Sequence, residues 1–294
     1  MLKTTEYLLL LAFISLSYDN AVFRPMAAKV DLYNNAYGNY EADVYRRIRT
    51  FTYGQDFGQT SWVSNEESHE IPALLGLRSN SHVLEIGCGS GLYALSLAES
   101  VSCEVLGLDV NEFAVKNANR LATQAGISDR VRFQTCDVSK PLAFQSASFH
   151  AAFSNDVICH IPDRLGLLRE LHRVLKPGGK LLLSDALVIG GIISHQEIAA
   201  RSSIGYYLFS PPGENQRQLT EAGFSVLDAK DTTASAVEIS ARWRQGRENS
   251  KVELIALEGE MNFEGLQQFL RCVQALASER RLLRYLYLAQ KSQQ

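Results

Sequence analysis

Residues 82–91 read His-Val-Leu-Glu-Ile-Gly-Cys-Gly-Ser-Gly, a short β-rich run that ends in a glycine-rich turn. We expect His82–Ile86 to form a buried strand, because it is a short apolar run bounded by glycine. A helix is predicted to follow from Leu92 to about Glu99. Such glycines let the backbone approach a ligand closely, at a helix N-terminus where several N–H groups are unpaired. The stretch therefore predicts a ligand site directly after the first strand.

Downstream, β-rich runs alternate with amphipathic helical runs. The expected strands are His82–Ile86, Glu104–Asp109, Val131–Cys136, Phe149–Ser154, Lys180–Leu187, Phe224–Ala229 and Leu283–Ala289. Further helices are predicted after the N-cap Asn111, from Pro162 to Pro177-Gly178-Gly179, and over Glu214–Ala222. The alternation is typical of a parallel sheet with helices on both faces. We predict an α/β fold with a doubly wound, Rossmann-like sheet and helical cap insertions.

The segments outside this pattern are expected to be helical and to cover the carboxyl edge of the sheet, where doubly wound folds bind ligands. Residues 31–294 are interpreted as a single domain, preceded by an apolar extension over 1–30. Its parts are an N-terminal cap (31–75), a cofactor-binding core (76–187), a lid (188–213) and a helical insertion (232–281).

Composition describes an ordinary soluble globular protein. The chain has 294 residues, 46% of them hydrophobic, with 29 Lys and Arg against 32 Asp and Glu, a net charge of −3. This balance argues against nucleic-acid binding, which needs uncompensated basic residues. Five scattered cysteines without a CxxC pair indicate reduced thiols, and no metal-ligand spacing occurs. We predict a cytoplasmic protein with neither a metal nor a membrane span.

The apolar run Tyr7–Leu16 is too short to cross a bilayer as a helix, although its length suits a secretory signal. We interpret it as a dispensable or lightly packed N-terminal helix.

Acidic residues follow the second and third expected strands. Asp109 ends strand two, where a carboxylate can accept hydrogen bonds from both hydroxyls of a ribose. The alternative interpretation is that Asp109 only caps the next helix. Asp137 follows strand three and could accept from an adenine amino group while Val138 packs on the ring. The turn is spaced Gly87-x-Gly89-x-Gly91, which differs from the GxGxxG of dinucleotide enzymes.

With these residues in place, the chain resembles the class I S-adenosylmethionine-dependent methyltransferases. VLEIGCGSG is similar to their first motif, Asp109 to their ribose acid, Asp137-Val138 to their adenine clamp, and LKPGGKLLLSD to their strand-five motif. The resemblance covers about Ser81–Leu187 and implies S-adenosylmethionine as the cofactor.

The segment from Ser154 to Asp163 (SNDVICHIPD) resembles that of phosphoethanolamine and sarcosine/dimethylglycine methyltransferases. The resemblance implies that Asp156 and His160 lie beside the methionyl end of the cofactor, with His160 paired to an N-terminal tyrosine. This chain departs from several relatives in having Asn155. Residues 53–62 (YGQDFGQTSW) resemble the segment that those enzymes fold over the cofactor.

The predicted catalytic residues are His160, as base or substrate orienter, and Tyr37 or Tyr40 as its partner. The predicted cofactor-binding residues are Tyr53, Gln59, Trp62, Glu85, Gly87, Gly89, Asp109, Val110, Asp137, Val138, Asn155 and Asp156. Lid residues that could line the substrate side are His195, Glu197, Arg201, Tyr206 and Tyr207.

The predicted reaction is methyl transfer to an amine nitrogen or a hydroxyl of a small molecule, by in-line displacement. Two alternatives stay open at this point: a dinucleotide-dependent oxidoreductase, against which the glycine spacing speaks, and a catalytically silent cofactor-binding module.

Overall fold

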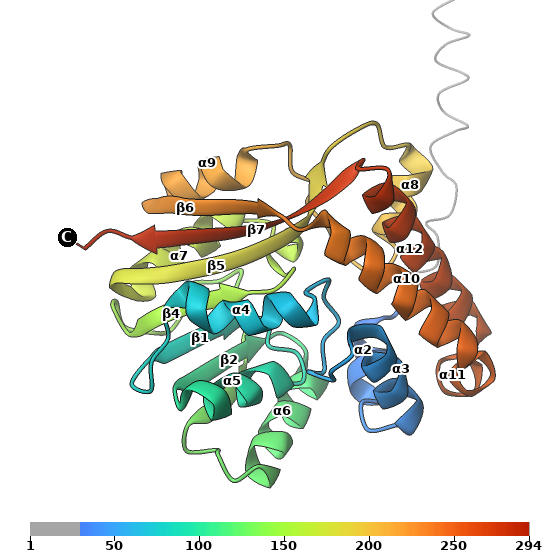
Figure 1. Ribbon diagram of the computed structural model, residues 1–294, viewed down its shortest axis with the longest axis horizontal. Coiled ribbons are helices and arrows are strands. Elements are labelled where there is room, and N and C mark those ends of the chain that lie inside the picture. Colours follow the sequence, from blue (N-terminus) through green and yellow to red (C-terminus); the bar gives the residue numbers. More distant parts are fainter. Residues whose placement is uncertain (1–29, 294) are drawn as a thin grey trace, which may run out of the picture.

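A seven-stranded sheet forms the centre of the computed structural model, which describes residues 30–293 (Figure 1). The strand order is β3-β2-β1-β4-β5-β7-β6. The strands are β1 (His82–Ile86), β2 (Glu104–Asp109), β3 (Val131–Thr135), β4 (Phe149–Ser154), β5 (Leu175–Ile189), β6 (Phe224–Asp231) and β7 (Leu282–Lys291). The predicted apolar run Tyr7–Leu16 lies outside the described residues. The predicted doubly wound α/β fold is confirmed.

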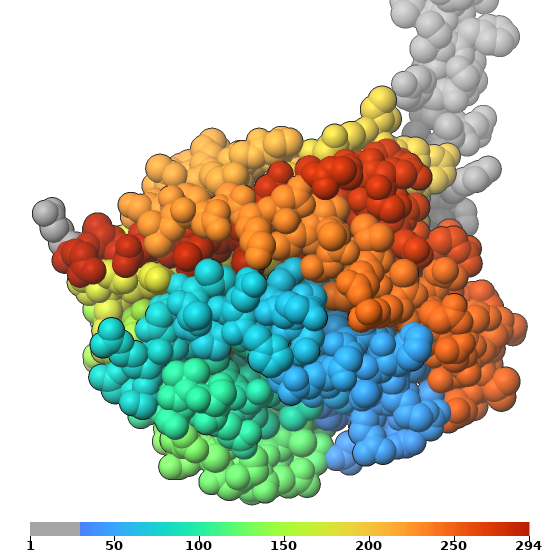
Figure 2. Space-filling model, in the orientation of Figure 1, coloured from blue at the N-terminus to red at the C-terminus, as the bar shows by residue number. Residues whose placement is uncertain are grey.

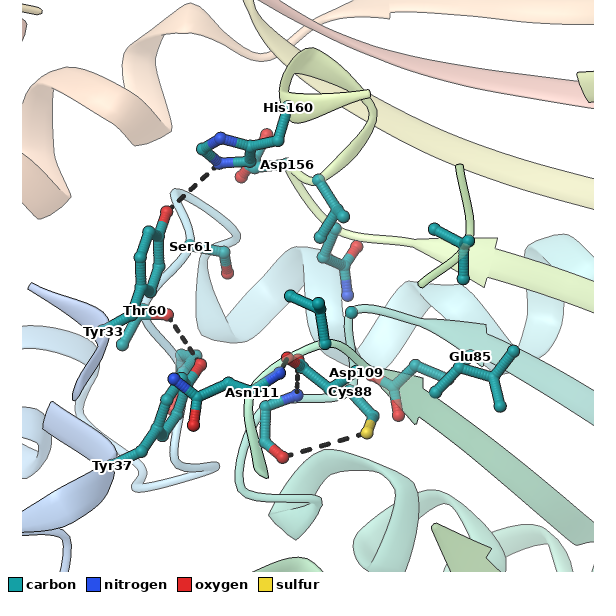
Figure 3. Close-up of a pocket in the computed structure, with 18 of the residues that line it drawn as sticks. Tyr33, Tyr37, Thr60, Ser61, Glu85, Cys88, Asp109, Asn111, Asp156 and His160 are labelled. Atoms are coloured by element: carbon teal, nitrogen blue, oxygen red, sulfur yellow. Dashed lines mark hydrogen bonds between the residues drawn. The ribbon is translucent and has the colours of Figure 1, made fainter. Parts of the chain in front are cut away.

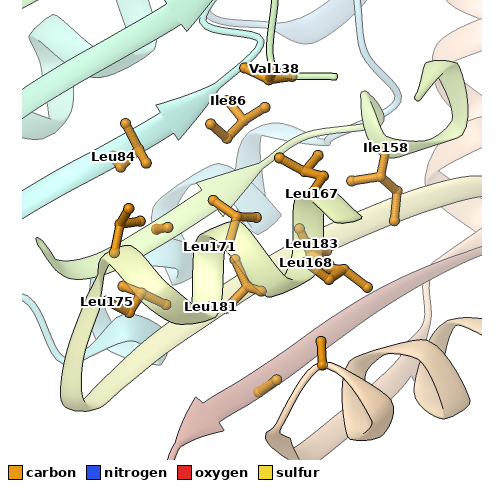
Figure 4. Packing of buried hydrophobic residues seen from close by; sticks show 14 of the residues in the cluster. Leu84, Ile86, Val138, Ile158, Leu167, Leu168, Leu171, Leu175, Leu181 and Leu183 are labelled. Carbon is orange, nitrogen blue, oxygen red and sulfur yellow. The ribbon is translucent and has the colours of Figure 1, made fainter. Parts of the chain in front are cut away.

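Helices cover both faces of this sheet. The helices are α2 (Tyr33–Gly38), α3 (Asp43–Tyr53), α4 (Asn65–Leu75), α5 (Leu92–Val101), α6 (Glu112–Gln124), α7 (Arg164–Val174), α8 (His195–Arg201), α9 (Glu214–Glu221), α10 (Thr233–Asn249), α11 (Lys251–Glu258) and α12 (Glu260–Ser278), with a 3-10 turn η1 (Ile158–His160). Helices α4, α5 and α6 pack on one face, and α7 and α9 on the other. Figure 4 shows Leu167, Leu168 and Leu171 of α7 directed at Leu84 and Leu183 of the sheet. Alternate residues of each strand thus face opposite helix layers.

Strand β7 corrects the expectation of a purely parallel sheet, because it runs antiparallel to both β5 and β6. The connection between β6 and β7 explains the direction. Strand β6 ends at the carboxyl edge of the sheet, and helices α10–α12 stay at that end of the molecule (Figure 1). The chain re-enters the sheet at Leu282, paired with Ile189 at the end of β5, so it must run backwards.

Helix α7 differs at both ends from the prediction. It begins at Arg164 instead of Pro162, because the side chain of Asp163 accepts the N–H of Gly166 and caps the helix there. It ends at Val174, before Pro177, because Leu175 already pairs with Phe149 in the sheet.

The front segment, the lid and the insertion share one hydrophobic cluster above the carboxyl edge. It joins Ile48 of α3, Ile204 of the lid, Trp243 of α10 and Phe269 of α12. In Figure 2 the front segment (blue) and the insertion helices (orange) form a continuous surface beside the core. No single segment has this core by itself, so the three parts of the cap depend on one another.

A buried ion cluster connects the cap to the sheet. The Arg284 side chain on β7 is fully buried, and its Nε donates to Asp156, which follows β4, at 3.0 Å. Its Nη1 donates to Glu67 of α4 at 2.7 Å and to Thr232 at 2.8 Å. Glu67 also accepts the hydroxyl of Ser235 on α10. One cation therefore holds four chain segments that are far apart in the sequence.

Replacing Arg284 by Met is expected to lower the free energy of unfolding by about 3–5 kcal/mol, because two buried carboxylates lose their cation. Urea denaturation followed by circular dichroism measures this. Arg280→Met removes an exposed partner of Asp231 and is the control, with an unchanged urea midpoint expected. Equal effects of the two substitutions would contradict the role given to Arg284.

Candidate active site

The loops that follow β1, β2, β3 and β4 meet at one edge of the sheet, because these four strands are parallel. Together with the cap they enclose a cavity of about 710 Å³. Of the predicted residues, Tyr37, Gln59, Glu85, Gly87, Gly89, Asp109, Val110, Asp137, Val138, Asn155, Asp156 and His160 line it. Tyr40, Tyr53 and Trp62 do not.

The glycine turn and Asp109 form the first wall of the cavity (Figure 3). Gly89 has a φ of +53°, and a Cβ there would lie 2.7 Å from the hydroxyl of Tyr37, so only glycine fits. The Gly89 N–H donates to one carboxylate oxygen of Asp109 at 2.9 Å, and the Asn111 N–H donates to the other at 2.8 Å. Burial raises the pKa of Asp109, and these backbone bonds oppose the rise. Each oxygen keeps a lone pair that can accept a ligand hydroxyl.

Three buried polar atoms on the cavity wall have no hydrogen-bond partner among residues 30–293: Glu85 Oε2, Asn155 Oδ1 and Gln59 Nε2. Unsatisfied buried polar atoms are uncommon in folded proteins, and they fit a site that a polar ligand completes. Burial, and secondly the charge of Asp109, raises the pKa of Glu85 well above its usual range. A raised pKa favours the protonated carboxyl, which can donate as well as accept a hydrogen bond.

Asp137 and Val138 also line the cavity. Asp137 is exposed, and its Oδ1 accepts from the hydroxyl and the N–H of Ser139 at 2.6 and 3.1 Å. These bonds and Lys140 lower its pKa, so the carboxylate is ionised and available to a donor. Val138 is buried beside it, whereas Val110 is exposed at the cavity mouth. An apolar slot with one acceptor at its end suits a flat, amino-bearing ring.

His160 closes one end of the cavity, above Asp156 (Figure 3). Its Nδ1 lies 2.9 Å from the carbonyl oxygen of Tyr206, and its Nε2 lies 3.2 Å from the hydroxyl of Tyr33. A carbonyl can only accept, so Nδ1 carries the proton and Nε2 accepts from Tyr33. Burial lowers the pKa of His160 to about 4, and the imidazole is neutral at physiological pH.

The tyrosine partner of His160 is Tyr33, and the prediction of Tyr37 or Tyr40 is wrong. Tyr37 points down to the glycine turn, where its hydroxyl lies 3.1 Å from that of Thr60. The Tyr40 ring lies under the Arg49 guanidinium, 4.2 Å from ring centre to Cζ, outside the cavity. Which tyrosine reaches His160 depends on how α2 is docked, and sequence spacing carries no signal of that docking.

Tyr53 and Trp62 lie outside the cavity and support the loop over residues 57–61 that lines it. The Tyr53 hydroxyl donates to the carbonyl of Ser61 at 2.8 Å. Trp62 packs in the cap cluster, 6.0 Å from Trp243 between ring centres, and its N–H donates to Asp156 at 2.8 Å. Asp156 is thereby held by Trp62 and Arg284 together. Sequence reasoning missed Tyr33, Thr60, Ser61 and Arg284, of which all but Arg284 line the cavity.

The lid contributes differently from expectation. Ile204 and Gly205 line the cavity, and Tyr206 contributes its carbonyl. Glu197 is instead turned to Arg281, in an ion pair of 2.7 Å, and His195 does not line the cavity. Arg201 and Tyr207 lie one layer behind it, in a small cavity of about 10 Å³ that also contacts Tyr33.

A doubly wound sheet whose glycine turn and buried strand-end carboxylate line a capped cavity is typical of enzymes that use a nucleotide cofactor. The sequence model of the family "Methyltransferase domain" matches residues 84–183. The 27-O-demethylrifamycin SV methyltransferase of Amycolatopsis mediterranei is 30% identical over 206 residues, which cover 68% of this chain and 75% of that protein. The chain therefore belongs to the S-adenosylmethionine-dependent methyltransferases, and S-adenosylmethionine is its methyl donor.

Phosphoethanolamine methyltransferases are also similar to this chain. The Triticum aestivum enzyme is 30% identical over 226 residues, which cover 76% of this chain and 42% of that protein. The chain thus spans less than half the length of this relative. A Haemonchus contortus phosphoethanolamine methyltransferase, solved with phosphomonomethylethanolamine and S-adenosylhomocysteine, has a TM-score of 0.74 at 23% identity, covering 89% of this chain and 60% of that one. The resemblance stated from the motifs is confirmed.

Across residues 30–293, no helix combines the length and apolar character that crossing a membrane requires.

Asp109→Asn is expected to weaken binding of S-adenosylhomocysteine about ten-fold or more, because an amide nitrogen would face a backbone N–H and lose an acceptor. Isothermal titration calorimetry measures the dissociation constant. Asp129→Asn, at an exposed turn away from the cavity, should leave it unchanged. An unaltered affinity of the Asp109 variant would contradict the site.

Proposed function

We propose that the cavity holds S-adenosylmethionine with its adenosine between Asp109 and Asp137 and its methionyl end beside Glu85, Asn155 and Gln59. The three unpartnered polar atoms support this placement, because an amino acid moiety brings both donors and acceptors. Asp109 would hold the ribose, and Val138 would pack on the adenine. This proposal assigns cofactor roles to residues on four successive strand ends.

We propose further that a small molecule binds between the cofactor and the Tyr33–His160 pair and is methylated on a nitrogen or an oxygen. The observation that carries this is the pair itself, which lies across the cavity from Glu85 and Asp109 (Figure 3). S-adenosylmethionine supplies an electrophilic methyl group on a sulfonium sulfur, and the acceptor must lie in line with it at about 3–3.5 Å. Relatives that act on a rifamycin and on phosphoethanolamine support both kinds of acceptor atom.

In this proposal His160 orients the acceptor. Its Nε2 is occupied by the Tyr33 hydroxyl, and the low pKa of the imidazole makes it a weak base. An acceptor that binds to the Tyr33 oxygen would be placed by this hydrogen bond. The pair also narrows the cavity at this end, and excluding water there would favour transfer to the acceptor.

We also propose a cytoplasmic location, supported by a methyl donor that is made in the cytosol and by cysteines that are all free among the described residues.

A screen of amines, phenols and other hydroxyl compounds with tritiated S-adenosylmethionine identifies an acceptor. With it, Tyr33→Phe is expected to lower kcat about ten-fold because it removes the bond to His160, whereas Tyr40→Phe outside the cavity should act at most weakly. A larger loss from Tyr40→Phe than from Tyr33→Phe would contradict the assignment of Tyr33.

The pH profile of kcat/KM tests the protonation state of His160. The pKa of His160 lies at about 4, so Nε2 is unprotonated from pH 6 to 8 and the histidine adds no change there. Activity should fall only as the pH approaches 4, where protonation removes the lone pair that holds Tyr33. An acid limb near pH 6.5 that disappears in His160→Gln would show an unperturbed histidine and contradict the assignment.

A further inference from the structure

Arg201, the last residue of α8, is a buried cation with no carboxylate partner among the described residues. Its side chain is only 2% exposed, and its Nη1 has no hydrogen-bond partner. Its guanidinium carbon lies 4.5 Å from the ring centre of Tyr207 and 5.1 Å from that of Phe269. Burying an unpaired cation costs several kcal/mol, which cation–π contacts offset only in part.

Arg201 is linked to His160 through two tyrosines. Tyr207 lies under the Arg201 guanidinium and shares a small cavity with Arg201 and Tyr33, and the Tyr33 hydroxyl lies 3.2 Å from His160 Nε2. The Tyr207 ring also lies against the His160 ring, 4.4 Å between centres. The chain of contacts therefore runs from the buried cation to the end of the cavity.

The carbonyl of Tyr206 sets the direction of the hydrogen bonds at His160. Because it can only accept, His160 Nδ1 must donate to it, and Nε2 must accept from Tyr33. The Tyr33 oxygen is then free to accept from Tyr207, whose oxygen can accept from the guanidinium. The guanidinium of Arg201 has donors and no acceptor. It can therefore donate to the oxygen of Tyr207 but cannot accept from its hydroxyl.

We infer that Arg201 is a positioning residue for methyl transfer, which acts through Tyr207 and Tyr33 to fix the orientation and the neutral tautomer of His160. The inference rests on the proposed role of the Tyr33–His160 pair. Arg201 lies behind the cavity wall and does not line the main cavity, so it acts through the tyrosines.

A neutral side chain of similar length would fill the space of Arg201 but would supply neither the donor nor the charge. The groups that face His160 are Tyr33 from α2, Tyr207 from the lid, Arg201 from α8 and Asp156 from the loop after β4. Burial is the largest cause that lowers the pKa of His160, and the charge of Arg201 lowers it further. The hydrogen bond to the Tyr206 carbonyl and the charge of Asp156 raise it. Loss of the guanidinium should therefore make His160 easier to protonate.

The test is histidine NMR titration of the full chain saturated with S-adenosylhomocysteine, comparing wild type, Arg201→Met and Arg201→Lys. The His160 signal is assigned by its absence in His160→Gln. In Arg201→Met the His160 pKa is expected to rise by about one unit, a ten-fold change in protonation, and Arg201→Lys should retain most of the wild-type value. With an acceptor, kcat should fall about ten-fold in Arg201→Met while KM for S-adenosylmethionine stays unchanged.

The matched control is Arg247→Met. Arg247 is equally buried in the cap and lies over Phe263 at 5.3 Å, but it pairs with Glu258 and has no link to His160. The Arg247→Met substitution should lower the free energy of unfolding without changing the pKa of His160. Tyr207→Phe, which removes one hydroxyl and keeps the ring, should lower kcat without changing the affinity for S-adenosylhomocysteine, and it covers the case in which Arg201→Met fails to fold.

An unchanged His160 pKa in Arg201→Met, or an equal shift in Arg247→Met, would overturn the inference, and so would full kcat in Tyr207→Phe. The proposed function would instead be contradicted by full activity of His160→Gln. The two failures are therefore distinguishable.

Discussion

The fully buried Arg284 joins the cap to the sheet through a cluster of buried charges. It places the Asp156 carboxylate at the end of β4 and the Glu67 carboxylate of α4 on one cation. Asp156 in turn accepts the N–H of Trp62, which fixes the loop that carries Gln59, Thr60 and Ser61 into the cavity. Removing one member of such a buried cluster leaves unpaired charge, so the cap and the sheet are stable only in one relative arrangement. The geometry of the cofactor cavity follows from that constraint.

The two ends of the cavity differ in chemistry because different parts of the chain build them. The parallel strands supply Asp109, Asp137 and Glu85, whose carboxyl groups are positioned by the sheet and its turns. The cap supplies Tyr33 and, behind it, Tyr207 and Arg201, which meet His160 from the core. In the proposed function, the core positions the cofactor and the cap decides what can approach it. Relatives with acceptors as different as a rifamycin and phosphoethanolamine fit this division of roles.

Much of the core was predictable from the sequence, and most of the cap was not. Strands β1, β2 and β4 begin and end where the pattern places them, and Asn111 caps α6 as expected, because local propensity and local hydrogen bonds determine these features. The antiparallel β7 depends on where a 50-residue insertion returns to the sheet, which no local pattern records. The identity of the histidine partner as Tyr33 depends on the packing of α2, and Arg284 reaches Asp156 across 128 positions of sequence. These are tertiary contacts between side chains whose local sequence carries no sign of them.

The most direct measurement is a crystal structure of the chain with S-adenosylhomocysteine. The account predicts ribose hydroxyls within hydrogen-bond distance of Asp109, the adenine against Val138, and the sulfur on the side of the cavity that faces His160 and Tyr33. A ligand bound in the reverse direction, or a ribose that makes no contact with Asp109, would contradict it.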